Sequence, residues 1–214
     1  MRNDPARQKR AGCQDRFFGS NASGPIADKI EMTKRKNKNQ KKFNDLIYAI
    51  KTRKCEDSLY SLVRKCINKK SYKMMIQYFE ESNEEDWELL DAMTLFKRQK
   101  TLNVIIEKYY KSKSSDYTSA LISAIGGVGL SSGIPFLKKI LPDLDDDIAS
   151  IAYIVLGQLS DNEEEFIFIL DDLDRRPDFK LWSNLYVAVE FFSTGPRSIT
   201  MSEQTLKRLS KYEP

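Results

Sequence analysis

The feature that most constrains the fold of this chain is a repeat of 31 residues in its apolar positions. One set of positions related by that spacing is Leu59, Leu90, Leu121 and Ala152, and another is Gly126, Gly157 and Ala188. About five such units run from residue 53 to residue 207. A unit of this length cannot bury its own apolar face, whereas neighbouring units that stack share one continuous core. The repeat therefore predicts a stack of similar units.

Within each unit the apolar residues recur every three to four positions, which is the spacing of one face of an α-helix. Such stripes are found at 43–50, 59–67, 72–79, 87–96, 102–109, 117–125, 134–141, 148–159, 166–173 and 179–192. Short segments with Gly, Pro, Ser, Asn or Asp separate them. Alternation with a period of two is nowhere sustained, so no sheet is expected. The chain is predicted to be all-α, with two helices in each unit.

Residues 147–161 read DIASIAYIVLGQLSD and resemble the short HEAT-like repeat that is named after phycobilisome lyases. In that motif an acidic loop precedes an Ala-rich helix, which ends in Leu-Gly-x-Leu/Ile-Gly-Asp. Ala149 stands where the family usually has Arg, and residues 124–137 resemble the same motif running into its second helix. The resemblance implies an α-solenoid of about five stacked antiparallel helix pairs, of the HEAT or armadillo kind. It implies no particular activity.

Charge divides the chain into two parts. Residues 1–42 contain twelve Lys and Arg against four Asp and Glu, with little to bury, so we expect a disordered basic tail there. The run of basic residues at 34–42 could contact nucleic acid or an anionic surface, and a solvated tail is the simpler interpretation. The HEAT-like repeat domain is predicted over residues 43–214, which hold 23 basic and 27 acidic groups and are mildly acidic.

The composition argues against several classes of enzyme. Histidine is absent, and serine or cysteine triads, zincins and histidine acid–base schemes all depend on an imidazole. The three cysteines, Cys13, Cys55 and Cys66, have no Cys-x-x-Cys spacing, which fits reduced thiols better than a zinc site. No stretch reaches the eighteen or so apolar residues of a membrane span. We therefore expect a cytoplasmic protein with no catalytic residues, no cofactor and no metal site.

Acidic clusters and exposed aromatic side chains are the candidates for a binding surface. The acidic candidates are Asp145, Asp146, Glu163, Glu164, Asp171 and Asp172. Several stand at predicted helix starts, where capping of free N–H groups is the alternative role. Because equivalent loops of a repeat lie along one edge, we expect these carboxylates to form one acidic ridge that attracts a basic protein. Tyr110 and Tyr186 are the aromatic candidates, with packing in the core as their alternative role.

A preformed helical stack with an acidic surface is typical of a protein that binds another protein and catalyses nothing. Within that class we favour a bacterial immunity or inhibitor protein that neutralises a basic toxin such as a nuclease, with a general scaffold or adaptor as the alternative. A nucleic-acid-binding protein or DNA glycosylase of the HEAT-like kind is a second class, which Lys108, Lys111, Lys138 and Lys139 would serve. Nucleic acid is disfavoured because the domain is acidic. An enzyme, such as a bilin lyase, is disfavoured because no residue set suits catalysis.

Overall fold

The computed structural model describes residues 38, 40–41, 43–48, 50, 52, 69–82, 85–177, 179–180, 182–194 and 199–212. Its α-helices are α3 (Lys69–Glu81), α4 (Trp87–Thr94), α5 (Gln99–Lys111), α6 (Ser115–Val128), α7 (Ile134–Ile140), α8 (Asp146–Leu159), α9 (Glu164–Leu173), α10 (Trp182–Thr194) and α11 (Glu203–Leu209). Residues 43–48 are helical as well. No strand occurs among the described residues, and the prediction of an all-α protein is confirmed there.

The eight apolar stripes predicted between residues 72 and 192 correspond to α3 through α10. The stripe predicted at 59–67 lies outside the described residues, as does the predicted tail apart from residues 38, 40 and 41. Side chains mark several helix starts by accepting a hydrogen bond from a backbone N–H of the first turn; these are Asp86, Ser114, Asp145 and Ser202. Gly129 ends α6 in a left-handed conformation (φ 72°), which glycine adopts without steric cost.

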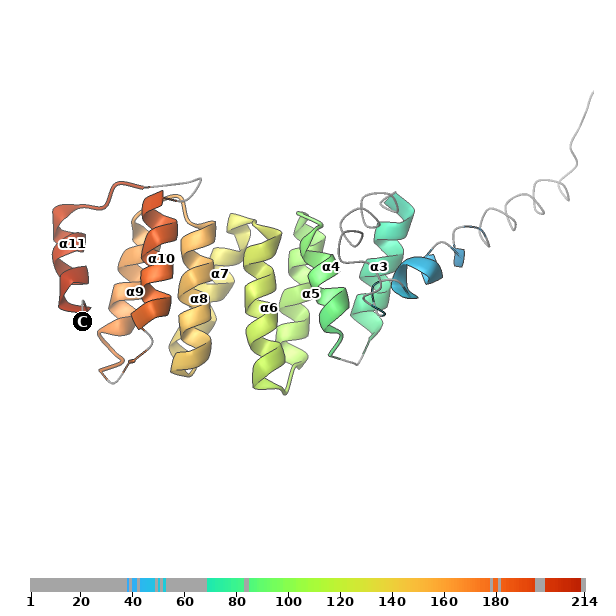
Figure 1. Ribbon diagram of the computed structural model, residues 1–214, viewed down its shortest axis with the longest axis horizontal. Coiled ribbons are helices and arrows are strands. Elements are labelled where there is room, and N and C mark those ends of the chain that lie inside the picture. Colours follow the sequence, from blue (N-terminus) through green and yellow to red (C-terminus); the bar gives the residue numbers. More distant parts are fainter. Residues whose placement is uncertain are drawn as a thin grey trace, which may run out of the picture. The chain divides into compact units, whose positions relative to one another are not determined.

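Two sets of helices alternate along the chain (Figure 1). We call α4, α6, α8 and α10 row A, because α6 packs against α4 and α8, and α8 packs against α10. We call α3, α5, α7, α9 and α11 row B. Successive helices of row A are therefore in contact although a row B helix separates them in the sequence, and α5, α7 and α9 each pack on a row A helix. The buried apolar residues form one core cluster that extends from Phe43 to Phe192.

Glycines at the predicted repeat position allow the helices of row A to approach closely. A Cβ atom on Gly126 would lie 3.1 Å from Val155 of α8. At the next predicted repeat position, a Cβ atom on Gly157 would lie 2.8 Å from the carbonyl oxygen of Ala188 in α10. Both contacts are closer than ordinary van der Waals separation, so a larger residue would push the helices apart. The recurrence of glycine at this spacing thus has a packing cause.

Three helices do not span their whole apolar stripe, and the first is α4, which ends at Thr94 while its stripe continues to residue 96. The stripe at 134–141 contains the seven residues of α7. The helix is followed by a 3-10 turn over Leu141–Asp143, which has Pro142 at its second position. Phe179 was expected in the helix that becomes α10, but it precedes that helix and its N–H donates to Arg176. Its ring is buried against Tyr153, with 5.7 Å between ring centroids. Phe179 therefore belongs to the core without being helical.

Candidate functional site

Three consecutive aspartates stand at the start of α8, and each has a different environment. Asp145 caps the helix by accepting a hydrogen bond from the N–H of Ile148 at 2.9 Å. Asp146 forms an ion pair with Arg176 at 3.0 Å. Asp147 is exposed in the first helical turn, where the helix dipole favours a negative charge. The capping alternative therefore holds for Asp145, although this residue, like Asp147, is exposed to solvent.

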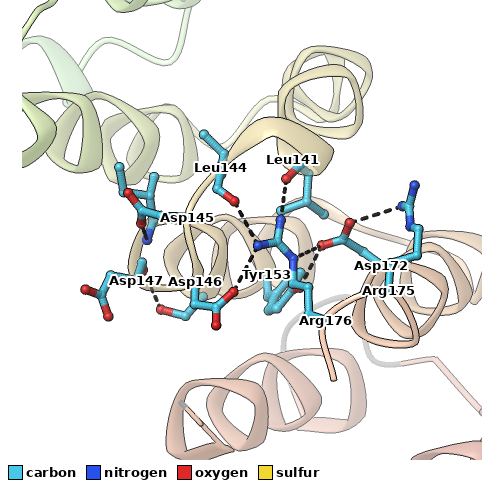
Figure 2. A network of polar contacts seen from close by, with 11 residues as sticks. Leu141, Leu144, Asp145, Asp146, Asp147, Tyr153, Asp172, Arg175 and Arg176 are labelled. Atoms are coloured by element: carbon cyan, nitrogen blue, oxygen red, sulfur yellow. Dashed lines mark hydrogen bonds and ion pairs between the residues drawn. The ribbon is translucent and has the colours of Figure 1, made fainter. Parts of the chain in front are cut away.

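Arg176 is the centre of a polar network that joins the end of α9 to the connection before α8 (Figure 2). Its guanidinium donates to the carbonyl oxygens of Leu141 and Leu144, both at 2.8 Å. It also donates to Asp172 at 2.8 Å. Burial would lower the pKa of Arg176, but the hydrogen bonds to Asp172 and Asp146 outweigh burial and raise it. The cation is thus fixed, and it binds two carbonyl oxygens of the connection between α7 and α8, of which that of Leu141 also accepts a hydrogen bond from the N–H of Leu144.

Asp172 belongs to this network and not to a binding surface, which corrects the expectation from the sequence. The residue is 1% exposed. Its carboxylate accepts hydrogen bonds from Tyr153 at 2.8 Å and from Arg175 at 3.1 Å, in addition to Arg176. Burial, followed by the hydrogen bond to Asp172, raises the pKa of Tyr153, which is also fully buried. Neither side chain is available to a partner.

Glu163 connects the start of α9 to the start of α11. Its carboxylate accepts hydrogen bonds from the backbone N–H and the hydroxyl of Ser202, at 2.8 and 2.7 Å. Hydrogen bonds from Thr205 and Ser202 lower the pKa of Glu163. The adjacent Glu164 is exposed, and its backbone N–H donates to Asn162 at 2.9 Å. Of these two candidates, Glu163 stabilises the C-terminal helix and Glu164 presents its carboxylate to solvent.

A second group of contacts holds α11 at the other end of α9. Arg208 pairs with Asp171 at 2.9 Å and with Asp174 at 2.6 Å. The hydroxyl of Tyr212 also donates to Asp174. The hydrogen bonds from Tyr212 and Arg208 lower the pKa of Asp174. Asp171 remains exposed despite its ion pair.

The acidic candidates lie at two opposite edges of the helix layer. Asp145 precedes α8, whereas Glu163 and Glu164 follow its end. Each helical residue adds about 1.5 Å, so the length of α8 places the two groups roughly 20 Å apart. The antiparallel α9 returns to the first edge, where Asp171 lies in its last turn. The expectation of one acidic ridge along one edge is therefore wrong, because the loops within and between helix pairs emerge on opposite sides.

Tyr110 and Tyr186 are 59% and 48% exposed, as predicted. Tyr110 lies in the last turn of α5 and contacts Phe136 of α7 edge to face, with 5.8 Å between ring centroids. The ammonium of Lys139 lies 5.7 Å from the Tyr110 ring. Tyr186 lies on α10, beside Tyr212 of the C-terminal turn, in a shallow surface recess. The two tyrosines come from different rows and do not form one site.

Two of the four lysines that would serve nucleic acid are held by contacts within the protein. Lys108 is buried and donates to the carbonyl oxygen of Ser82 at the end of α3, and burial lowers its pKa. Lys138 forms an ion pair with the buried Glu165 at 3.3 Å. Lys111 and Lys139 are exposed. The positive charge that this surface offers to a phosphate backbone is therefore small.

Basic residues are distributed unevenly between the two rows, which the sequence analysis missed. The row A helices α4, α6, α8 and α10 contain no Lys or Arg. Of the row B helices, α3, α5, α7 and α11 each contain at least two, whereas α9 contains none. Exposed carboxylates occur on every row A helix and are those of Asp91, Asp116, Asp147 and Glu190. The absence of Lys and Arg from every second helix was visible in the sequence, but its meaning depends on which helices share a layer.

Comparison with protein-family models, with curated proteins and with solved structures returns no match to this chain. Within the described ranges, no group of three or more Cys, Asp or Glu side chains has the arrangement of a metal site. None of the helices in the same ranges has the length and apolar character that crossing a membrane requires.

Proposed function

We propose that this chain is a non-catalytic, protein-binding α-solenoid of the HEAT-like kind, with about five stacked helix pairs, that acts in the cytoplasm. The observation that carries the proposal is the composition of the outward face of row A. Ser123 of α6, Ile154 of α8 and Val187 of α10 occupy exposed or half-buried positions there. Ser, Ile and Val are weaker helix formers than the Ala, Glu and Lys typical of solvent-facing positions. These residues contribute little to helix stability, and contact with a partner accounts for their presence.

The stacked core makes such a face suitable for protein binding. Close contacts at Gly126 and Gly157 fix the separation of the row A helices. The Arg176 network and the contacts of α11 fix the ends of the helices relative to one another. A surface held in this way loses little conformational entropy when it binds, so more of its contact energy appears as affinity.

Within this class we favour an immunity or inhibitor protein that neutralises a basic toxin, for example a nuclease. A nuclease needs a basic surface to hold its substrate, and a row of helices with carboxylates and no cation complements such a surface. A scaffold or adaptor for a basic protein has the same surface requirement and is the alternative. Nucleic-acid binding, including the glycosylase alternative, is disfavoured because Lys108 and Lys138 are held by internal contacts.

Affinity capture from an extract of the source organism tests the proposal. The full-length chain is immobilised, and the same chain with Leu156→Pro, which should lose its stacked core, is the control. We expect one stoichiometric basic protein on the native chain only, recovered at low and at moderate salt. If the purified partner loses a toxic or nuclease activity when the chain is added, the inhibitor role is supported; an unchanged activity favours the scaffold. Recovery of nucleic acid without a protein would refute protein binding.

A further inference from the structure

The outward face of row A has exposed carboxylates, uncharged side chains and no cation on any of its four helices. Asp116, Asp147 and Glu190 are exposed on α6, α8 and α10, respectively. Between them the face carries aliphatic side chains, including the half-buried Ile154 and the exposed Val187. Surface helices ordinarily mix both signs of charge. A face with one sign of charge and aliphatic side chains selects its occupant by charge.

Two kinds of occupant are disfavoured by these charges. A second copy of the chain, packed face to face about a two-fold axis, would bring the same carboxylates together. A nucleic acid would bring phosphates to the face, and no Lys or Arg on these helices could pair with them. A polypeptide with Lys or Arg between aliphatic side chains could pair its cations with the carboxylates and pack its aliphatic side chains on those of the face. We propose that the outward face of row A is the docking surface for a basic polypeptide segment of the partner protein.

This inference rests on the proposed function and adds the location and the chemistry of the contact. Asp116 and Asp147 stand at equivalent repeat positions, each in the first turn of its helix. Packed helices lie about 8–10 Å apart. Three residues of extended chain span about 10 Å. A segment that crosses the row with Lys or Arg at every third position would therefore reach one helix after another.

A designed peptide tests the docking surface. The probe is a synthetic peptide of about twelve residues, with Arg at every third position and Leu and Ser between, long enough to cross the row. The reference peptide has Glu in place of Arg. Binding to the full chain is measured by fluorescence anisotropy at low salt, and its location by backbone amide chemical shifts. We expect the Arg peptide alone to bind and to shift Ser123, Ile154 and Val187. Equal binding of both peptides, no binding, or shifts confined to row B or to the helix ends would overturn the inference.

Charge-reversal variants provide a matched control. The row A variant carries Asp116→Lys, Asp147→Lys and Glu190→Lys, which change two first-turn positions and one later helical position. The control variant carries Glu164→Lys, Glu203→Lys and Glu107→Lys, which change the same kinds of position on row B and alter the net charge equally. We expect the row A variant to bind the Arg peptide about tenfold more weakly or worse, and the control to change affinity less than about twofold. Circular dichroism shows whether both variants remain folded.

The same two variants separate this inference from the proposed function. If the affinity capture yields no protein, the proposed function fails whatever the peptide does. Each variant is also immobilised in place of the native chain. If the native chain captures a basic partner that the row A variant still captures and the row B control does not, protein binding stands and the docking surface is wrong. A partner that only the row A variant loses supports both.

Discussion

Replacing Arg176 with alanine would remove the cation that holds the connection between α7 and α8 onto the end of α9. Removing one partner of a buried ion pair costs about 3–5 kcal/mol, because the other charge remains buried without its counter-ion. The affected charge is Asp172, whose side chain is 2% exposed. Arg175 still contacts Asp172 at 3.1 Å, and Tyr153 still donates to it at 2.8 Å. We therefore expect the lower end of that range, about 3 kcal/mol.

The measurement is thermal unfolding followed by circular dichroism. For a chain of this size each kcal/mol shifts Tm by about 2–4 °C, so Arg176→Ala should lower Tm by roughly 6–12 °C. Arg175→Ala is the matched control, because Arg175 is the next residue and pairs with the same carboxylate. Its side chain is 56% exposed, against 12% for Arg176. An exposed ion pair contributes about 0–1 kcal/mol. Equal losses of Tm in the two variants would refute the reasoning from burial.

Three further outcomes are expected. Gly157→Ala should lower the free energy of unfolding by about 1–3 kcal/mol, because the added Cβ has no room beside α10. The control Ser123→Ala, on the open face, should change it by less than about 0.5 kcal/mol. Equal effects of the two variants in denaturant unfolding would contradict the close packing. Leu156→Pro should cost about 3 kcal/mol or more and reduce helicity in neighbouring helices, so an unchanged circular dichroism spectrum would argue against a shared core. Tyr212 and Arg208 hold the pKa of Asp174 below its unfolded value of 3.8. The stability that these contacts contribute is therefore fully present above pH 3.8, and it is lost as the pH falls through the lowered pKa of the folded state. An NMR titration should show α11 amides changing in that acid range, and Tyr212→Phe should reduce the pH dependence; identical titrations of the two proteins would exclude the proposed cause.

The pattern of apolar residues was sufficient to predict the helices. A helix buries one stripe of its surface, so the spacing of residues such as Leu121 and Ile125 reports helical structure wherever the chain has it. The recurrence of Gly126 at Gly157 was likewise visible, and its packing cause is now clear. Helix ends were less predictable: Phe179 fits the stripe of α10, yet it lies before the helix and packs on Tyr153 from a turn. Apolar spacing reports burial, and burial does not require helical structure.

The roles of the charged residues could not be derived from the sequence, because charge alone does not indicate a neighbour. Asp171 and Asp172 are adjacent in the chain, yet the first faces solvent and the second is buried against Arg176. Asp145 and Glu163 lie at opposite edges because α8 separates them, and Asp171 lies at the edge of Asp145 because α9 runs antiparallel to α8. The local sequence thus determined the helices, since these depend on residues a few positions apart. Only the tertiary structure decided which carboxylates are exposed and that α4, α6, α8 and α10 form one cation-free layer, since these follow from contacts between helices about thirty residues apart in the chain.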